Sequence, residues 1–228
     1  MSSENASPYY LMSPSGIADR LSRFQRSRMF ERFCRLAKLA PESTILDVGV
    51  TMDRLRPSAN YLEAWYPHKE MITAVGLENA KFLEECYPGV RFVEANGLEL
   101  PFPDRSFDVA FSSAVLEHVG SATNQIRFVQ ELSRVADKAI FLTTPNRWFP
   151  IELHTSLPLV HWLPRRTSRA IMAKLGVGFY ADEANLNLVS RRDLLSMTTQ
   201  VAGFAFEVES ISLIGWPSNL LLIGYRQD

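Results

Sequence analysis

Two acidic residues each follow a short apolar run, and their positions suggest a ligand site. Asp47 stands near the end of the run 44–50, and Glu78 closes the run 71–78. The apolar residues of these runs are continuous, which is typical of strands buried on both faces of a parallel sheet. In open α/β sheets an acid at the end of such a strand faces the crevice that binds ligands. The alternatives are that Asp47 only caps the turn at Gly49 and that Glu78 only caps the helix that follows it.

The rest of the chain supplies strands and helices in alternation. Further strands are expected at 90–94, 107–113 and 139–143, and helices at 17–39, 61–65, 79–87, 123–136 and 191–201. Strands alternating with helices imply crossover connections and a Rossmann-like, doubly wound, mostly parallel α/β sheet. Two final runs, 204–213 and 219–225, are separated only by Gly215 to Ser218. They should form an antiparallel hairpin at the sheet edge and complete seven strands.

The segment after the fifth expected strand has a different composition. It holds Trp148 and Trp162, followed by a basic run at Arg165, Arg166 and Arg169. This suggests a helical lid inserted into the sheet domain. We therefore expect an N-terminal extension and helix at 1–39 and one domain at 40–228, with the lid at 145–185.

Composition and charge indicate an ordinary globular protein. The chain has 228 residues, of which 46% are hydrophobic and 21% charged, and its net charge is −1. This charge argues against broad nucleic-acid binding, which needs a basic surface. The two cysteines, Cys34 and Cys86, lack metal-ligand spacing and favour a reducing cytosol. No signal peptide or membrane-spanning run is visible, so we expect a cytoplasmic protein.

The helix expected at 17–39 has one apolar and one basic face. The basic face carries Arg20, Arg23, Arg26, Arg28, Arg32, Arg35 and Lys38. A solvated face explains such a pattern most simply. A contact with an acidic substrate or an anionic membrane surface is the alternative.

Together these motifs resemble the class I S-adenosylmethionine-dependent methyltransferases, in particular the small-molecule branch of the ubiquinone-biosynthesis type. Leu46-Asp47-Val48-Gly49 stands at the first motif of the family and Val75-Gly76-Leu77-Glu78 at its second acid. The most specific block matches in order and spacing, at residues 100–104, 106–109 and 116–119. The resemblance covers residues 40–145 closely and the final hairpin by topology. Residues 144–150 also resemble a subgroup associated with bacterial polysaccharide gene sets.

The glycine-rich loop departs from the family pattern. The family usually has a second glycine two residues after the first, so that the backbone passes close to the cofactor. Here Gly49 is followed by Val50 and Thr51. The Thr51 hydroxyl could replace a backbone contact, or the loop could be wider.

The resemblance implies S-adenosylmethionine as the cofactor and assigns roles around it. Glu78 would accept hydrogen bonds from the two ribose hydroxyls. Asn96, beside Gly97, would read the adenine amino group through its amide oxygen, unless it only shapes the loop. Asp47 would orient the Gly49 loop or, through water, hold the ammonium group of the cofactor. The remaining candidates are Ser112 and Ser113, which could face the methionine part or be structural.

Methyl transfer is an in-line displacement at a sulfonium, and a positioned base helps when the attacking group is a hydroxyl. His154, which opens the lid, can reach the crevice and is the candidate catalytic base, although a structural role is open as well. His118 suits packing or capping, and His161 suits the core of the lid. Tyr180 and Glu183 are further substrate-side candidates. No metal cluster is visible in the sequence, so no metal is expected.

Three functions remain open at this point. The first is methyl transfer to a small-molecule or saccharide acceptor, which includes lipid-linked acceptors and leaves peripheral membrane contact open. The second is a catalytically silent, methyltransferase-like binding module, suggested by the missing glycine. The third is a nicotinamide-dependent oxidoreductase, although the Gly49 loop lacks the dinucleotide fingerprint.

Overall fold

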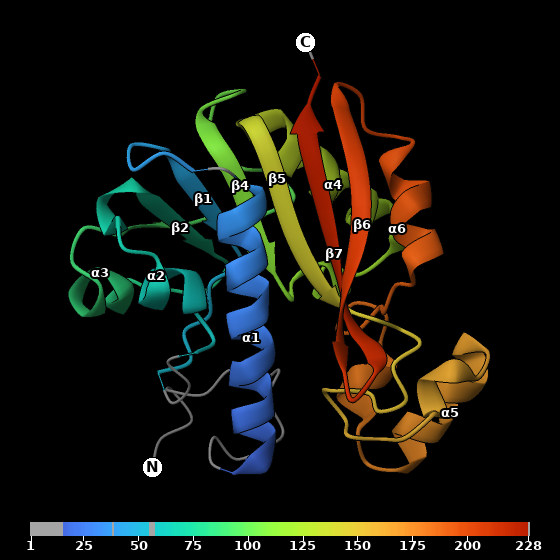
Figure 1. Ribbon diagram of the computed structural model, residues 1–228. Helices are drawn as coiled ribbons and strands as arrows, with labels where there is room; N and C mark the ends of the chain where they lie inside the picture. The colour runs from blue at the N-terminus through green and yellow to red at the C-terminus, as the bar shows by residue number, and fades with distance from the viewer. Residues whose placement is uncertain (1–15, 38, 55–57, 228) are drawn as a thin grey trace.

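The computed structural model describes residues 16–37, 39–54 and 58–227, and a seven-stranded sheet forms its centre (Figure 1). The strand order is β3-β2-β1-β4-β5-β7-β6. Strands β1 to β5 are parallel, whereas β7 is antiparallel to both β5 and β6. The strands are β1 Ile45–Val48, β2 Ile72–Gly76, β3 Arg91–Glu94, β4 Phe107–Ser113, β5 Ala136–Pro145, β6 Phe204–Leu213 and β7 Trp216–Arg226. The expected doubly wound, mostly parallel sheet is confirmed.

Helices cover both faces of this sheet. The first face carries α1 Ile17–Leu36, α2 Tyr61–Trp65 and α3 Phe82–Cys86, and the second carries α4 Ala122–Val135 and α6 Arg191–Thr198. The remaining helix, α5 Arg165–Lys174, lies below the sheet in Figure 1. Short 3-10 turns occur at η2 Lys69–Met71, η3 Leu116–His118, η4 Val160–Trp162 and η5 Gly178–Ala181.

The central strands alternate their side chains between two apolar cores. In β1, Ile45 joins the core under α1, and Leu46 joins the core under α4. All four residues of β1 are buried, which explains why its apolar run is continuous. Phe33 of α1 packs edge-on against the rings of Phe111 and Phe141, at centroid distances of 4.9 and 5.4 Å.

The C-terminal hairpin differs from the expected one at its turn. Trp216, Pro217 and Ser218 belong to β7, so the expected four-residue connection is wrong. The turn consists of Ile214 and Gly215, with φ angles of 51° and 77°. Positive φ at both central residues is the geometry that two-residue hairpins prefer, since its twist matches that of the strands. Only β6 of this hairpin lies at a sheet edge, because β7 lies between β5 and β6, and the opposite edge is β3.

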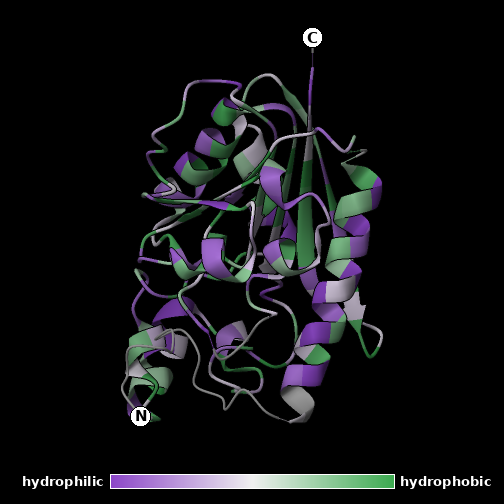
Figure 2. Cartoon of the chain, turned by 90° about the vertical axis from the view of Figure 1, so that its left-hand side faces the viewer, coloured by the Kyte–Doolittle hydropathy of each residue, from purple (hydrophilic) through white to green (hydrophobic). Residues whose placement is uncertain are grey.

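Part of the basic face of α1 packs on the protein itself. Arg28 donates to the Ser212 carbonyl at 2.6 Å, and Arg32 pairs with Glu209 at 2.9 Å. The interpretation of a wholly solvated face is therefore wrong for these two arginines, which hold α1 against β6. Arg20, Arg23 and Arg35 are exposed as expected, and Figure 2 shows hydrophilic and hydrophobic bands alternating along α1. The predictions for Lys38 and for residues 1–15 lie outside the described residues.

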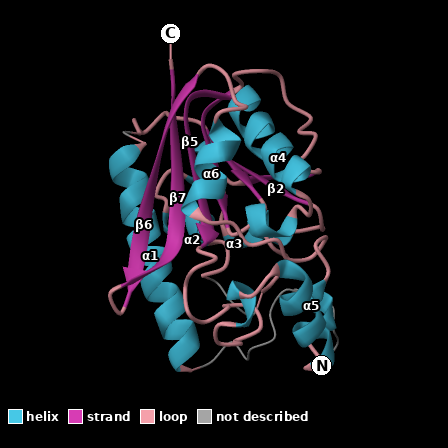
Figure 3. Ribbon diagram, turned by 90° about the vertical axis from the view of Figure 1, so that its right-hand side faces the viewer, coloured by secondary structure: helices cyan, strands magenta, loops and turns pink. Residues whose placement is uncertain are grey.

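The segment 146–189 forms a layer beyond the carboxyl ends of the parallel strands (Figures 1 and 3). Backbone bridges join Asn146 to Val189 and Ile151 to Pro158, and α5 with two 3-10 turns completes the layer. We call this segment the lid. Among the described helices, none is both long and apolar enough to span a membrane. The cytoplasmic location stays a prediction, as do the domain boundaries.

Candidate active site

The loops that follow β1, β2 and β3 start side by side. Gly49 donates its N–H to the Val75 carbonyl at 2.7 Å, and Ala95 donates to the Gly76 carbonyl at 2.9 Å. This places the Asp47, Glu78 and Asn96 regions along one end of the sheet, as the strand order requires. The cofactor-side residues predicted from the sequence therefore share one edge.

The Gly49 loop is braced by a residue that the sequence analysis missed. Asn60 accepts the Thr51 N–H and donates to the Thr51 carbonyl, each at 2.9 Å. The Thr51 hydroxyl accepts the Asp53 N–H at 3.2 Å. Gly49 itself has φ 108°, and a Cβ there would lie 2.1 Å from a methyl group of Val115. The loop thus needs its first glycine for packing and holds its shape without a second one.

Asp47 lies in a buried acidic pair with Glu63 of α2. The exposed fractions of the two residues are 6% and 0%. Burial, and then the charge of Glu63, raise the pKa of Asp47 well above its ordinary value. Burial also raises the pKa of Glu63 and, nearby, that of the Tyr61 phenol. The Glu63 partner was not predicted, because only the packing of α2 on β1 brings it there.

Glu78 and Asn96 are exposed beyond their strands. The Asn96 side-chain oxygen accepts the Leu98 N–H at 2.9 Å, so the loop-shaping role considered for Asn96 is present. At Gly97 a Cβ would lie 2.7 Å from the Phe128 ring, so this glycine lets the loop pack on α4. Ribose and adenine contacts by these residues stay predictions.

The two serines at the end of β4 have different surroundings. Ser112 is fully buried, and its hydroxyl donates to the Val48 carbonyl at 2.7 Å, which ties β4 to β1. Ser113 shares a hydrogen bond of 2.9 Å with the Thr143 hydroxyl. Ser112 therefore has the structural role that the sequence analysis left open, whereas Ser113 lies toward the Tyr61 side of the crevice.

A sharp turn after β4 presents Glu117 and His118 to the lid. Ala114, with φ 57°, ends the strand, and its N–H is held by the Thr143 carbonyl at 2.9 Å. Gln125 of α4 then donates to the carbonyls of Leu116 and Asn187, at 3.1 and 2.7 Å. These bonds clamp the turn against the end of the lid.

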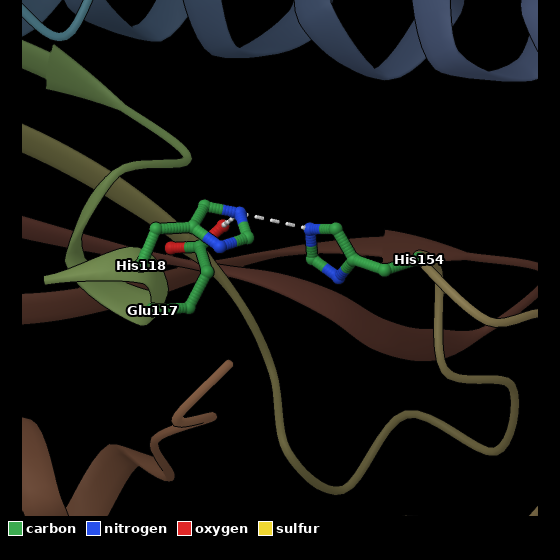
Figure 4. A group of neighbouring side chains, drawn as sticks. All are labelled: Glu117, His118 and His154. Carbon is green, nitrogen blue, oxygen red and sulfur yellow. Dashed lines mark hydrogen bonds and ion pairs between the residues drawn. The ribbon is translucent and has the colours of Figure 1, made fainter. Parts of the chain in front are cut away.

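His154 meets this turn from the opposite side. Its Nε2 lies 3.1 Å from Nε2 of His118, and its Nδ1 lies 2.7 Å from a Glu152 oxygen. The Nδ1 of His118 lies 2.7 Å from the Asn185 carbonyl. Glu117 accepts the Thr144 hydroxyl at 2.9 Å through one oxygen, and its other oxygen lies 3.9 Å from His118 Nε2. Figure 4 shows the two imidazoles facing each other with the Glu117 carboxylate beside His118.

The electrostatics of this cluster follow from burial and from Glu152. Burial lowers the pKa of His118 to about 3 and raises that of Glu117 to about 7. For His154 burial acts downward, but the hydrogen bond and charge of Glu152 outweigh it and raise the pKa. Burial acts to raise the pKa of Glu152, but the hydrogen bonds and charge of His154, with a hydrogen bond from Thr155, lower it to about 2. Glu152 was missed because its partners lie in an irregular loop.

A cavity of about 50 Å³ adjoins this cluster within the lid. Its wall includes Tyr180, whose ring centroid lies 5.8 Å from that of His154. Three arginines also line it, namely Arg147, Arg165 and Arg169. Burial and the charge of Arg165 lower the pKa of Arg147, which indicates crowded positive charge. The predicted candidate Glu183 lies 3.8 Å from Arg165 and 3.5 Å from Arg169.

Comparison with known proteins identifies the domain. Residues 49–140 match the family described as "Methyltransferase domain". Over 63 residues the chain is 43% identical to a probable S-adenosylmethionine-dependent methyltransferase of Mycobacterium tuberculosis. This match spans 27% of the chain and 22% of that relative, so the chain matches about a fifth of the relative's length. The domain is a class I S-adenosylmethionine-dependent methyltransferase domain.

Solved structures agree with this assignment at the level of the fold. The magnesium protoporphyrin IX methyltransferase of Synechocystis, solved with bound S-adenosylhomocysteine, superposes with a TM-score of 0.60 at 13% identity, covering 96% of this chain and 91% of that one. The [4+2]-cyclase SpnF also has a TM-score of 0.60, at 14% identity, covering 96% and 86% of the two chains.

The methyltransferase prediction and its cofactor, S-adenosylmethionine, are confirmed for this domain. The family match removes the oxidoreductase hypothesis. The ubiquinone-type branch stays a prediction.

Proposed function

We propose that this protein transfers a methyl group from S-adenosylmethionine to a hydroxyl of a small-molecule or saccharide acceptor that carries an anionic group. The observation that carries the proposal is the Glu152–His154 pair in the lid, beyond the carboxyl ends of the strands. A carboxylate on Nδ1 fixes the tautomer of the ring and leaves Nε2 as the proton acceptor. This arrangement supports His154 as the base for an attacking hydroxyl.

In the reaction the acceptor oxygen attacks the methyl carbon in line with the sulfonium, and the carbon–sulfur bond breaks. The hydroxyl proton moves to His154 Nε2. The protein contributes mainly by positioning the two reactants, since the cofactor already carries an activated methyl group. The exposed Glu78 at the same edge would hold the ribose hydroxyls through its carboxylate.

The class of acceptor is inferred from the cavity that Tyr180, the ring neighbour of His154, helps to line. Three arginines line this cavity, and the Glu183 carboxylate lies near two of them, Arg165 and Arg169. Arginine binds phosphate or carboxylate groups through paired N–H donors. An anionic acceptor, such as a lipid-linked phosphosugar, would relieve this concentration of positive charge.

The test is a screen of hydroxylated anionic acceptors with labelled cofactor, followed by His154→Ala. Turnover should fall about 100-fold, the scale of a lost general base, while binding of S-adenosylhomocysteine stays unchanged. His68→Ala is the matched control, because His68 lies by η2, outside the cluster of Glu117, His118, Glu152 and His154, which we call the lid cluster. Loss of cofactor binding in His154→Ala would indicate a fold defect, and an unchanged rate would exclude the base role.

A silent binding module is the second candidate. Two observations favour it, namely Thr51 in place of the second glycine and the presence of a cyclase among the proteins with this fold. Cofactor binding by the wild-type protein without transfer to any acceptor in the screen would support this candidate over the first.

A further inference from the structure

The two histidines of the lid cluster face each other through nitrogen atoms that have no hydrogen to share when both rings are neutral. The Nδ1 of His118 points at a carbonyl and the Nδ1 of His154 at a carboxylate. Both contacts require the hydrogen on Nδ1, because these oxygens only accept. Each Nε2 then turns a lone pair toward the other ring, and the two nitrogen atoms lie 3.1 Å apart. A proton or a cation between the rings would remove the repulsion of these two lone pairs.

A third ligand atom completes the group. Glu117 is fully buried, and its Oε1 accepts no hydrogen bond within the described part of the chain. This oxygen and the two Nε2 atoms all lie within 4.8 Å of one another. A buried carboxylate oxygen without a donor is costly unless a cation compensates it.

We propose that Glu117, His118 and His154 bind a divalent transition-metal ion of the Zn²⁺ class. Two imidazoles and one carboxylate form a common ligand set of zinc sites that keep a position open. Zinc–nitrogen bonds of about 2.0–2.1 Å in a tetrahedron place neighbouring ligands about 3.3 Å apart, close to the spacing of the two Nε2 atoms. The outer partners of the rings, a carboxylate and a backbone carbonyl, are those that metal-bound histidines usually have.

The surrounding structure already orients the three ligands, and the Glu117 oxygen, 3.9 Å from His118 Nε2, would move closer to the rings on binding the ion. Thr144 fixes the Glu117 carboxylate, Glu152 fixes His154, and the Asn185 carbonyl fixes His118. The ligands come from η3 and from the lid, which are far apart in the sequence. This explains why the spacing of the residues suggested no metal site.

The inference goes beyond the proposed function, since metal binding rests on these contacts alone. One Nε2 atom holds either a proton or a metal ion, so a bound ion would replace His154 as the activating group. The acceptor hydroxyl would bind the open position and lose its proton to solvent water, because the ion lowers the pKa of a bound oxygen. Its oxygen would then attack the methyl carbon as before.

The experiment measures binding of Zn²⁺ and Co²⁺ to the full chain after treatment with a chelator. The exposed Cys34 and Cys86 are replaced by serine throughout, because free thiols bind zinc. We expect one ion per chain by equilibrium dialysis and a Co²⁺ absorption band typical of a low-coordinate nitrogen–oxygen site. Binding should also raise the midpoint of thermal unfolding, because the ion binds only the folded chain.

Ligand and second-shell variants test the assignment of the ion to this cluster. His118→Gln and His154→Gln should each weaken Zn²⁺ binding more than ~100-fold, and Glu152→Gln, which only orients His154, by about 10–100-fold. His68→Gln should bind like the wild type, and unfolding curves show whether each variant is folded. Absence of one-to-one binding in the wild type, or wild-type affinity in folded ligand variants, would overturn the proposal. If the wild type binds no ion but His154→Ala still loses turnover, the metal site is overturned and the base role of His154 stands. The two proposals can therefore fail separately.

Discussion

Buried ionisable side chains gather on both sides of the crevice end of the sheet. On the first side, Asp47 and Glu63 form an acidic pair whose pKa values are raised by burial. On the lid side lie Glu117 and Glu152, each 2% exposed or less. Burial of four carboxyl groups is unfavourable for a fold on its own. Such groups are retained where they bind or position something, which agrees with a cofactor and acceptor site between them.

The first residue-scale prediction concerns the ribose contact of Glu78. Glu78→Ala should weaken binding of S-adenosylhomocysteine by at least ~1.5 kcal/mol, about tenfold, because charge-assisted hydrogen bonds are lost. Isothermal calorimetry on both proteins measures the difference. Glu85→Ala is the matched control, an exposed acid on the neighbouring helix α3. Equal affinities for the wild type and Glu78→Ala would remove the ribose assignment.

Single residues were predictable where a local pattern fixed their position. Asp47 and Glu78 follow apolar runs, and strand order alone brings such ends to one edge. Glu63 and Glu152 were missed because no local pattern marks them. The first depends on the packing of a five-residue helix, and the second on a loop without regular structure.

At the scale of elements, the most specific family block supports the fold. Arg134 of α4 donates to the carbonyls of Leu100 and Phe102, at 3.0 and 2.7 Å, and pairs with Asp104 at 2.9 Å. Glu131 orients this guanidinium at 2.9 Å and also accepts the Leu100 N–H. The loop 100–104 is thereby fixed to α4 at the start of β4, away from the crevice end of that strand.

Asp108, in the same block, joins the starts of β1 and β4 and gives a pH-dependent prediction. It accepts the Thr44 N–H at 2.8 Å and the Thr44 hydroxyl at 3.1 Å, and Lys138 lies 2.6 Å away. Burial acts to raise its pKa, but the bonds from Lys138 and Thr44 lower it below the usual value of 3.8. A lowered folded-state pKa gives stability that is present above the unfolded-state pKa and is lost as the pH falls through the folded value.

Asp108→Asn should therefore lower the free energy of unfolding by about 1 kcal/mol at pH 7, mainly through the charge-assisted bonds to Thr44. The exposed ion pair with Lys138 adds little. Urea unfolding at pH 7, 5 and 3.5 measures the difference, which should be constant from pH 7 to 5 and shrink at 3.5. A difference that stays the same down to the lowest pH would show that charge is not its cause.

Most elements were predictable because their patterns are local. The strands at 107–113 and 204–213 and the helix at 61–65 have the expected bounds, and the others shift by a few residues. The fifth strand is longer than expected, from Ala136 to Pro145, because β7 pairs with it as far as Pro145. Pairing partners of this kind come from distant sequence. The hairpin turn was misplaced because the sequence Trp216-Pro217 resembles a turn. In the structure both residues belong to β7 and pair with β6.

At the scale of the whole molecule, one end concentrates exposed apolar and basic side chains. The lid, the tip of the β6–β7 hairpin and the first turns of α1 all lie at this end (Figures 1 and 3). We call it the lid end. Its exposed apolar side chains are Leu21, Phe24, Trp148, Ile151, Leu153, Leu159, Leu163, Leu175, Phe179, Ile214 and Trp216. Its exposed basic side chains include Arg20, Arg23, Arg165 and Arg166.

Contacts between tryptophans make the hairpin tip and the lid one surface. Trp216 donates its ring N–H to the Trp148 carbonyl at 2.9 Å, and its ring stacks on Trp162 at a centroid distance of 6.2 Å. Tryptophan and aliphatic side chains beside arginine are typical of proteins that rest on an anionic membrane surface. A lipid-linked acceptor would then reach the lid from the membrane.

We therefore expect the protein to sediment with liposomes that contain anionic lipids, and less with neutral ones. Raising the salt concentration should release it, since the attraction between arginine and anionic lipid is screened within a Debye length.

Ile214, at the hairpin tip, is 94% exposed, and Ile214→Ser should lower the partition coefficient about tenfold, the scale of one lost aliphatic insertion. Leu195→Ser is the matched control, because Leu195 is 42% exposed on α6, along the side of the sheet. Equal absence of binding to both kinds of liposome would exclude the membrane contact. Equal losses in the two variants would show that the apolar contact is not specific to the lid end.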